Sequence, residues 1–284
     1  MIDPDSIVTG PSVAGVMVTR ERPERAIRAI RSFAAQDYTN KRLVVVCDGA
    51  GDGRLSDAIA SVSSLDVTMT TRPLGRLTLG ALRNLAVDMA GAEYVTQWDD
   101  DDLYHVSRIS LQVASVLLHD ADACFLTDQL HYIERTRSLY WCDWSAPREH
   151  GPWARTIPNT LLCKTGVMPR YPESGPLSAR SEDLFVMERL LAGARTVATK
   201  GVGYLYVYVQ HGCNTWAEDH HLRIIRRCGL DTTDLIQRRA VLDDAVRQYG
   251  LVAPLMVRSF RDEPALCLSD AGELVGALSA PVTH

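Results

Sequence analysis

The chain has 284 residues, of which 46% are hydrophobic and 23% charged, a balance typical of an ordinary soluble globular protein. Its length suffices for one large α/β domain or two small ones, each with ample core. A net charge of -5 and a pI near 5.9 exclude a global field that would draw the protein to nucleic acid or anionic lipid. We therefore expect no nucleic-acid partner, and any phosphate must be bound by a local site.

Seven scattered cysteines show no Cys-x-x-Cys spacing of the kind that zinc sites use. They predict reduced core thiols of a cytosolic protein. The N-terminus, Met1 to Ser6, is acidic and lacks the basic start and apolar segment of a signal peptide. No stretch approaches the ~20 apolar residues that a membrane span needs. The expected location is therefore the cytoplasm, with no membrane span.

The first hundred residues alternate between strand and helix patterns, which is typical of βα units and a largely parallel sheet. The predicted strands are residues 13–19, 43–47, 67–71 and 93–98. Three helices are predicted between these strands: the first begins at Pro23, the second covers 55–62 and the third covers 78–90. Ligands of such sheets bind outside the carboxyl ends of the strands. Thr19, Asp48 and the run Asp99–Asp102 all lie at those ends.

The pattern changes after a predicted helix over residues 104–118. Closely spaced strands at 123–127, 130–134 and 139–144 leave no room for crossover helices, which predicts an antiparallel or mixed section. The later elements are expected in this order: long loops over 145–180 around a short strand at 160–163, a helix over 182–191, strands at 196–199 and 204–209, two amphipathic helices within 218–246, and a small hairpin over 264–276. The helices after residue 218 could pack on the domain or on a second subunit, so a homo-oligomer stays open.

Four consecutive aspartates, Asp99 to Asp102, follow the apolar stretch that ends at Trp98. Carboxylates this close repel one another, so water, a basic side chain or a bound metal must take up the charge. Hard cations such as Mg²⁺ or Mn²⁺ prefer oxygen ligands, and Mg²⁺ is commonly held by carboxylates together with substrate phosphates. The alternative is a solvated acidic turn in which Asp102 caps the next helix. The run by itself leaves both interpretations open.

Three further signals bear on this choice, and each has a purely structural alternative. Arg83, in the helix before the fourth strand, could reach the same strand ends and compensate a nucleotide, or could be a solvated helix arginine. Glu182 and Asp183 begin an apolar-periodic helix after Ser181, a good N-cap, and a half-exposed carboxylate there suits a general base. His211 follows a strand and could be a ligand or an ordinary hydrogen-bonded histidine.

In this order, these features resemble the family 2 glycosyltransferases with the GT-A fold. The resemblance covers roughly residues 13–216 and is carried by Val16-Met-Val-Thr19 leading into Pro23, Val44-Val-Val-Cys-Asp48-Gly, Gly80-Ala-Leu-Arg83-Asn84, Tyr94 through Asp102 as the DXD region, and Glu182-Asp183. It implies an α/β fold with a Rossmann-like, mostly parallel nucleotide-binding sheet, a mixed or antiparallel acceptor-side section and C-terminal helices. The implied domain is 13–216, with a nucleotide-sugar half (13–102) and an acceptor half (103–216), flanked by an N-terminal extension (1–12) and a helical extension with the hairpin (217–284).

The resemblance also implies roles for individual residues. The nucleotide-sugar contacts are expected at Thr19, Glu21, Asp48, Arg83, Asp99 and Asp100. The divalent cation, Mn²⁺ or Mg²⁺, is expected at Asp99, Asp101 and His211. Because every position of the run is acidic, the register is open by one residue, and Asp100 or Asp102 could hold the cation instead.

The implied reaction is transfer of a sugar from a nucleoside-diphosphate sugar, expected to be a UDP-sugar, to an acceptor hydroxyl with inversion at the anomeric carbon. Asp183 is expected to be the general base, with Glu182 orienting the loop or binding the acceptor. Aromatic faces pack on sugars, so the acceptor is expected at Trp141, Trp144 and Trp153, although each could simply fill the core. The alternatives are a nucleotidyltransferase, for which Thr19-Arg-Glu-Arg-Pro lacks the expected glycines, and a non-catalytic binding domain.

Overall fold

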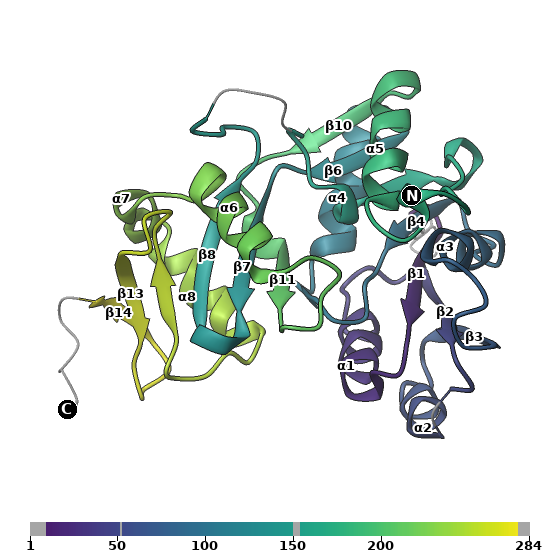
Figure 1. The fold of residues 1–284 in the computed structure, drawn as a ribbon, viewed down its shortest axis with the longest axis horizontal. Coiled ribbons are helices and arrows are strands. Elements are labelled where there is room, and N and C mark those ends of the chain that lie inside the picture. The colour runs from purple at the N-terminus through teal and green to yellow at the C-terminus, as the bar shows by residue number, and fades with distance from the viewer. Residues whose placement is uncertain (1–9, 52, 150–153, 278–284) are drawn as a thin grey trace, which may run out of the picture. The chain divides into compact units, whose positions relative to one another are not determined.

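The computed structural model of the chain describes residues 10–51, 53–149 and 154–277. The chain forms two compact units, each built on its own seven-stranded sheet (Figure 1). The first unit takes in the chain up to Asp101, then Ile109–Phe125 and Pro158–Val197. The second takes in Asp102–Arg108, Leu126–Ile157 and the chain from Ala198 on. No helix within the described ranges is long and apolar enough to cross a membrane.

The sheet of the first unit is parallel over its N-terminal strands and mixed beyond them, where β9 is antiparallel to both of its neighbours. In spatial order its strands are β10 (Thr196–Thr199), β6 (Ala123–Leu126), β9 (Leu162–Lys164), β4 (Tyr94–Gln97), β1 (Val13–Thr19), β2 (Lys41–Asp48) and β3 (Asp66–Arg72). Strand β1 pairs in parallel with β2 and β4, and β2 with β3. Strand β9 runs antiparallel to β4 and β6. Strands β1 and β2 are buried almost throughout, as central parallel strands covered on both faces must be.

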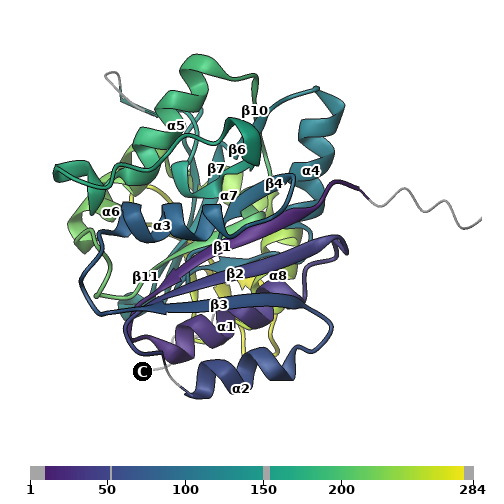
Figure 2. The ribbon, with the colours of Figure 1, turned by 90° about the vertical axis from the view of Figure 1, so that its right-hand side faces the viewer.

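Helices cover both faces of the parallel strands. The helices of this unit are α1 (Pro23–Ala34), α2 (Gly53–Ser61), α3 (Leu79–Asp88), α4 (Arg108–Leu118, from Ile109 on) and α5 (Glu182–Gly193). In Figure 2, α1 and α2 lie on one side of β1, β2 and β3, and α3 lies on the other. Pro23 starts α1 because its fixed φ suits the first helical position. Phe33 of α1 meets Trp98 edge-on at 4.9 Å between ring centroids, and the Trp98 Nε1 donates to the Ala29 carbonyl at 3.1 Å. These two contacts fix the start of the aspartate run against α1.

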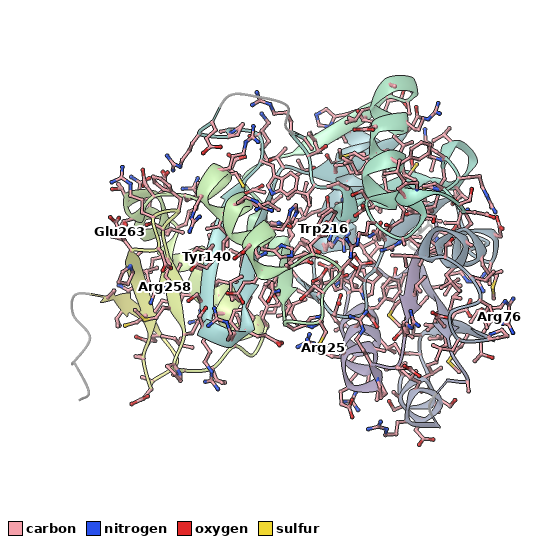
Figure 3. All side chains as sticks on the ribbon, in the orientation of Figure 1. Arg25, Arg76, Tyr140, Trp216, Arg258 and Glu263 are labelled. Atoms are coloured by element: carbon pink, nitrogen blue, oxygen red, sulfur yellow. The ribbon has the colours of Figure 1, made fainter. Side chains whose placement is uncertain are left out.

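The sheet of the second unit is mixed. In spatial order its strands are β14 (Leu274–Gly276), β13 (Pro264–Leu268), β12 (Met256–Arg258), β8 (Ser138–Asp143), β7 (Asp128–Ile133), β11 (Tyr206–Gln210) and β5 (Leu103–Tyr104). Strand β11 is parallel to β7, and β12 is parallel to β8, while the other pairs are antiparallel. Its helices are α6 (Glu218–Cys228), α7 (Thr232–Gln237) and α8 (Arg239–Gln248). Figure 3 shows Tyr140 on β8, where its hydroxyl donates to Asp262 Oδ1 at 2.7 Å.

Short 3₁₀ helices occupy several connections in both units. They are η1 (Glu134–Thr136), η2 (Pro158–Thr160), η3 (Thr165–Val167), η4 (Pro176–Ser178) and η5 (Gly203–Leu205). Apart from these turns, the predicted loop character of residues 154–180 is confirmed around the single strand β9. The short strand predicted at 160–163 is shifted to Leu162–Lys164.

The alternation of strands and helices in the first hundred residues is confirmed, as are the mixed section and the antiparallel pair β13–β14. The helix predicted over 104–118 is wrong at its start, because Leu103–Tyr104 form β5 against β11 and α4 begins only at Arg108. Asp102 therefore does not cap that helix. Within the described residues, three helices replace the two predicted over 218–246. Strand β12 was not predicted, because a strand of three residues is too short to show a recognisable alternation of apolar and polar residues.

Candidate active site

A cavity of about 360 Å³ opens in the first unit where β1 and β2 end. Its lining includes Thr19, Glu21 and Asp48, so the structure brings together three of the residues predicted to contact the nucleotide-sugar. Gly49 and Gly51 line the same cavity with φ of 136° and 79°, a backbone that other residues rarely adopt. Asp48 is buried and accepts a hydrogen bond from the backbone N–H of Gly75 at 2.7 Å, which fixes the direction of its carboxylate.

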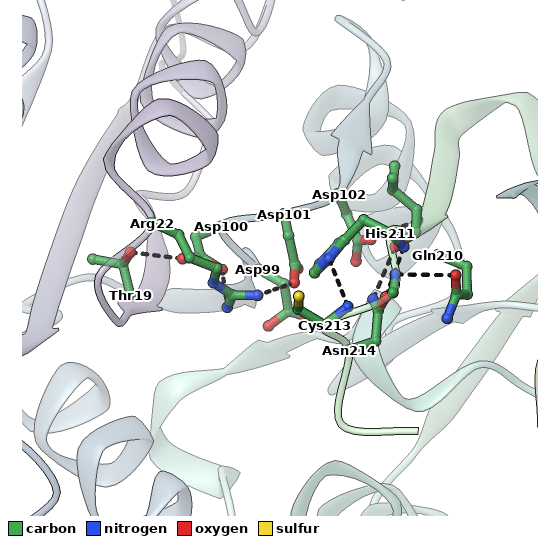
Figure 4. Close-up of polar contacts among 12 residues, drawn as sticks. Thr19, Arg22, Asp99, Asp100, Asp101, Asp102, Gln210, His211, Cys213 and Asn214 are labelled. Carbon is green, nitrogen blue, oxygen red and sulfur yellow. Dashed lines mark hydrogen bonds and ion pairs between the residues drawn. The ribbon is translucent and has the colours of Figure 1, made fainter. Parts of the chain in front are cut away.

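The aspartate run alternates between buried and partly exposed carboxylates. Asp100 is 1% exposed and accepts from the Thr19 hydroxyl at 2.6 Å, from the adjacent strand β1 (Figure 4). Asp102 is 2% exposed and, in the second unit, accepts from the backbone N–H of Val209 at 2.9 Å and from the Tyr206 hydroxyl. The side chains of Asp99 and Asp101 keep 19% and 15% of their surface exposed. The first and third carboxylates thus keep part of their surface exposed, whereas the second and fourth are buried.

Arg22 compensates the middle of the run. Its Nη2 lies 2.7 Å from Asp100 Oδ1 and its Nη1 lies 2.6 Å from Asp101 Oδ2, so one guanidinium spans two neighbouring carboxylates (Figure 4). Burial and the adjacent Asp101 charge raise the pKa of Asp100 to about 7, although Arg22 and the Thr19 hydroxyl oppose the shift. Sequence reasoning missed Arg22. The available signal was a basic residue directly between the end of β1 and the proline that starts α1.

Arg83 links the start of the aspartate run to the start of α5. Its Nε lies 2.9 Å from Glu182 Oε1 and its Nη2 lies 2.9 Å from Asp99 Oδ1. The arginine is only 7% exposed, and the two carboxylates hold its pKa above the usual range despite the cost of burial. The solvated-helix alternative for Arg83 is therefore wrong. The residue is a buried bridge between Asp99 and Glu182.

Asp183, the predicted base, begins α5 beside this bridge. Its Oδ1 accepts from the backbone N–H of Leu184 at 2.8 Å. Burial, followed by the charge of Glu182, raises the pKa of Asp183 to about 7, while Arg83 partly opposes the shift. Ser181 occupies the N-cap position but has φ of 61° and makes no capping side-chain hydrogen bond, so its predicted capping role is wrong.

The remaining predicted site residues belong to the second unit. The His211 backbone N–H donates to Asn214 Oδ1 at 2.7 Å, and its Nδ1 accepts from the Cys213 N–H at 3.3 Å (Figure 4). Trp141 is 2% exposed, donates from Nε1 to Asp128 at 2.9 Å and belongs to the hydrophobic core, which supports the core-filling alternative. Trp144 is partly buried against the cluster around Ile224 and Ile225, and Trp153 lies outside the described residues.

The carboxylates of Asp99 and Asp101 are the kind of oxygen donors that suit a hard divalent cation, and both retain exposed surface. Across the described ranges, no three His, Cys, Asp or Glu side chains gather closely enough to hold a metal ion. The donor chemistry fits the implied cation, with two carboxylates as the protein's contribution and Arg22 and Arg83 as their present partners.

Comparison with known proteins decides the family. Residues 16–162, just over half of the chain, match the family described as Glycosyl transferase family 2. The chain belongs to this family. The matched range contains β1 from Val16 on, β2, β3, β4, the cavity residues and the whole aspartate run, whereas Glu182, Asp183 and His211 follow it.

Individual proteins similar to this family 2 chain are also named as glycosyltransferases or share its fold. It is 31% identical over 105 residues to WcaA of Escherichia coli (strain K12), a glycosyl transferase named for colanic acid biosynthesis, covering 37% of each chain. S. aureus TarS in complex with UDP superposes with a TM-score of 0.54 at 17% identity, over 76% of this chain and 63% of that one. The mannosyltransferase PcManGT from Pyrobaculum calidifontis, in complex with GDP-Man and Mn²⁺, gives 0.52 at 16% identity, over 84% and 65%. The chain thus spans less than two thirds of the length of each, and the structural likeness establishes the GT-A fold.

Proposed function

We propose that this chain is a metal-dependent, inverting glycosyltransferase that moves a sugar from a nucleoside-diphosphate sugar to an acceptor hydroxyl. The observation that carries the proposal is the continuous array within the first unit. The proposed base-binding cavity, the partly exposed Asp99 and Asp101, the Arg83 bridge and Asp183 follow one another through direct contacts or adjacent positions.

The donor is assigned to the cavity lined by Thr19, Glu21 and Asp48. Its volume of about 360 Å³ lies within the range of roughly 300–1,000 Å³ found for small-molecule sites. TarS has been crystallised with UDP and UDP-GlcNAc, and PcManGT with GDP-Man, which supports a nucleoside-diphosphate sugar as the donor class. A UDP-sugar is the donor we expect, and the test below distinguishes the two bases.

Asp99 and Asp101 are the residues we assign to the divalent cation, and the ligand role expected for His211, in the second unit, stays a prediction. The alternation of the run favours this register, because Asp100 and Asp102 are almost fully buried whereas Asp99 and Asp101 keep exposed surface. Asp100 is accordingly better placed to support the site than to contact the donor. A divalent cation stabilises the negative charge that develops on the departing diphosphate.

Asp183 is the general base in this proposal. The acceptor oxygen bonds to the anomeric carbon from the face opposite the diphosphate. At the same time the bond between the anomeric carbon and the β-phosphate oxygen breaks, and the nucleoside diphosphate leaves with the electron pair of that bond. The acceptor proton moves to the Asp183 carboxylate, and the configuration inverts. A pKa of about 7 suits a base that accepts a proton near neutral pH. Glu182, held by Arg83, orients the first turn of α5.

The acceptor is a hydroxyl compound, and Trp144 is the predicted aromatic contact that keeps partial exposure. Seven free cysteines, six of them buried, support the cytoplasm as the proposed location. An oligomer built through the C-terminal helices stays a prediction.

Thermal shift and calorimetry with UDP and GDP, each with and without Mn²⁺, test the donor and cation assignments. We expect one nucleotide to stabilise the protein, and Mn²⁺ to tighten its binding. Asp101→Asn should abolish the Mn²⁺-dependent gain, whereas Asp270→Asn, in the exposed turn after β13, should retain it. Asp183→Asn should bind the nucleotide nearly normally and transfer no sugar. Normal turnover by Asp183→Asn would remove Asp183 as the base.

A further inference from the structure

Arg22 lies where two functions of the site meet. Its side chain bridges Asp100 and Asp101, and it also lines the cavity that contains Thr19 and Asp48. Glu21, with φ of 48°, and Pro23, at the first position of α1, set the backbone on either side of it. A short turn between strand and helix therefore presents one guanidinium to both the carboxylates and the cavity.

The contact with Asp101 conflicts with the cation assignment. Nη1 of Arg22 lies 2.6 Å from Asp101 Oδ2, so a positive charge already occupies that oxygen. A divalent ion bound by the same carboxylate would lie within a few ångströms of the guanidinium, and like charges at that distance repel each other even near a protein surface. Arg22 and the cation therefore compete for Asp101.

Arg22 has the freedom to change partners. Its side chain is 33% exposed, whereas that of Asp100 is 2% exposed and is also fixed by the Thr19 hydroxyl. The two contacts use different nitrogens, so Nη1 can leave Asp101 while Nη2 stays on Asp100. The planar guanidinium suits phosphate oxygens as well as carboxylates.

We propose that Arg22 exchanges a carboxylate for a phosphate. In the free protein it neutralises Asp100 and Asp101. When a divalent cation and a nucleoside diphosphate bind, Arg22 gives up Asp101 and its freed nitrogen binds a phosphate oxygen in the cavity. Arg22 thereby keeps the carboxylate pair ordered before the donor arrives and opposes binding of the cation without the nucleotide. This inference rests on the proposed function, because it takes Asp101 as a cation ligand.

The test measures Mn²⁺ binding by electron paramagnetic resonance of the free ion, first without nucleotide and then with the nucleoside diphosphate that binds. Arg22→Gln should bind Mn²⁺ alone about tenfold more tightly than the unmodified chain, a typical coupling between competing ligands. The same variant should bind the nucleoside diphosphate in the presence of Mn²⁺ about tenfold more weakly, since one charge-assisted hydrogen bond is lost. Arg31→Gln, on the exposed last turn of α1, is the matched control and should change neither constant.

Opposite shifts of the two constants distinguish the exchange from a structural role, which would weaken both. Arg22→Lys keeps the charge but cannot span two carboxylates. Its Mn²⁺ affinity should therefore lie between that of the unmodified chain and that of Arg22→Gln. Circular dichroism confirms that each variant is folded. A folded Arg22→Gln variant with unchanged or weaker Mn²⁺ binding overturns the exchange while the cation assignment stands. If neither the unmodified chain nor Arg22→Gln binds Mn²⁺ under either condition, the metal dependence itself fails, and the exchange fails with it.

Discussion

Arg83 shows how a single buried arginine orders two residues of the candidate site, Asp99 and Glu182. Removing a guanidinium from water is costly, and here two carboxylates at 2.9 Å offset that cost. Asp99 and Glu182 are separated by more than eighty positions in the chain, yet they share this one partner. The pairing ties the segment after β4 to the first turn of α5, so one side chain contacts both the aspartate run and the residue next to the proposed base.

The raised pKa of Asp183 predicts the pH dependence of transfer. A general base works in its ionised form, so kcat/KM should fall tenfold per pH unit below about pH 7, the pKa of Asp183, and level off above it. An aspartate with the usual pKa of 3.8 would give no such limb. The measurement is initial-rate kinetics under subsaturating acceptor across the neutral range.

Glu182→Gln provides the internal check on this profile. Removing the Glu182 charge takes away the second largest cause of the raised pKa of Asp183, so the midpoint should move to lower pH. An acid limb that persists unchanged in Asp183→Asn would assign the titration to another group.

At the scale of elements, the position of α3, which bears Arg83, depends on the close packing of Gly80 against the loop at Pro172. A Cβ added to Gly80 would lie 1.9 Å from the backbone carbonyl oxygen of Pro172, far closer than any real contact. Asn84, on the next turn, also bonds to the same loop, donating to the Tyr171 carbonyl at 2.9 Å and accepting from the Tyr171 N–H at 2.8 Å. Helix and loop are thus joined where only glycine leaves room.

Gly80→Ala should therefore destabilise the protein by roughly 1–3 kcal/mol, the usual cost of overpacking, despite the better helix propensity of alanine. Gly193→Ala is the matched control, since it also lies in a helix of the first unit and a Cβ there meets nothing within 4 Å. Urea unfolding followed by circular dichroism compares the two. Equal stability of both variants would show that the loop at Pro172 yields freely.

At the scale of the whole molecule, the reactivity of the seven cysteines measures whether the cores of the two units exclude solvent. All seven are free, six are buried and Cys213 alone is exposed, and every one of them lies in the described ranges. Burial also raises the pKa of the Cys163 thiol to about 12 and that of Cys47 above its usual value, which suppresses the reactive thiolate.

We therefore expect one thiol to react rapidly with a chromogenic disulfide reagent in the native protein, and all seven to react in guanidinium. Cys213→Ser should eliminate the rapid phase and leave six thiols after unfolding. Rapid reaction of several thiols in the native protein would mean that one of the two cores is open to solvent.

Local pattern sufficed for much of the fold. The strand β1 was predicted at its observed bounds, because six apolar residues followed by the polar Thr19 leave little ambiguity. Strand-end positions also placed Thr19, Asp48 and the aspartate run at one edge of a parallel sheet, since the carboxyl ends of parallel strands meet there. The prediction of the start of α4 was wrong because Leu103–Tyr104 pair with residues about a hundred positions later in the chain. Local propensity contains no information about so distant a partner.

The sequence by itself therefore determined the family and the fold class, and it predicted the acidic run as the centre of the site. Only the tertiary structure decided which carboxylates keep exposed surface and which arginines they meet. Arg22 and Asp101 lie 79 positions apart, Arg83 and Glu182 lie 99 apart, and Asp102 meets the N–H of Val209 across 107. Each pairing depends on side chains converging from separate elements, and a run of four identical residues gives no local signal of which partner each one will find.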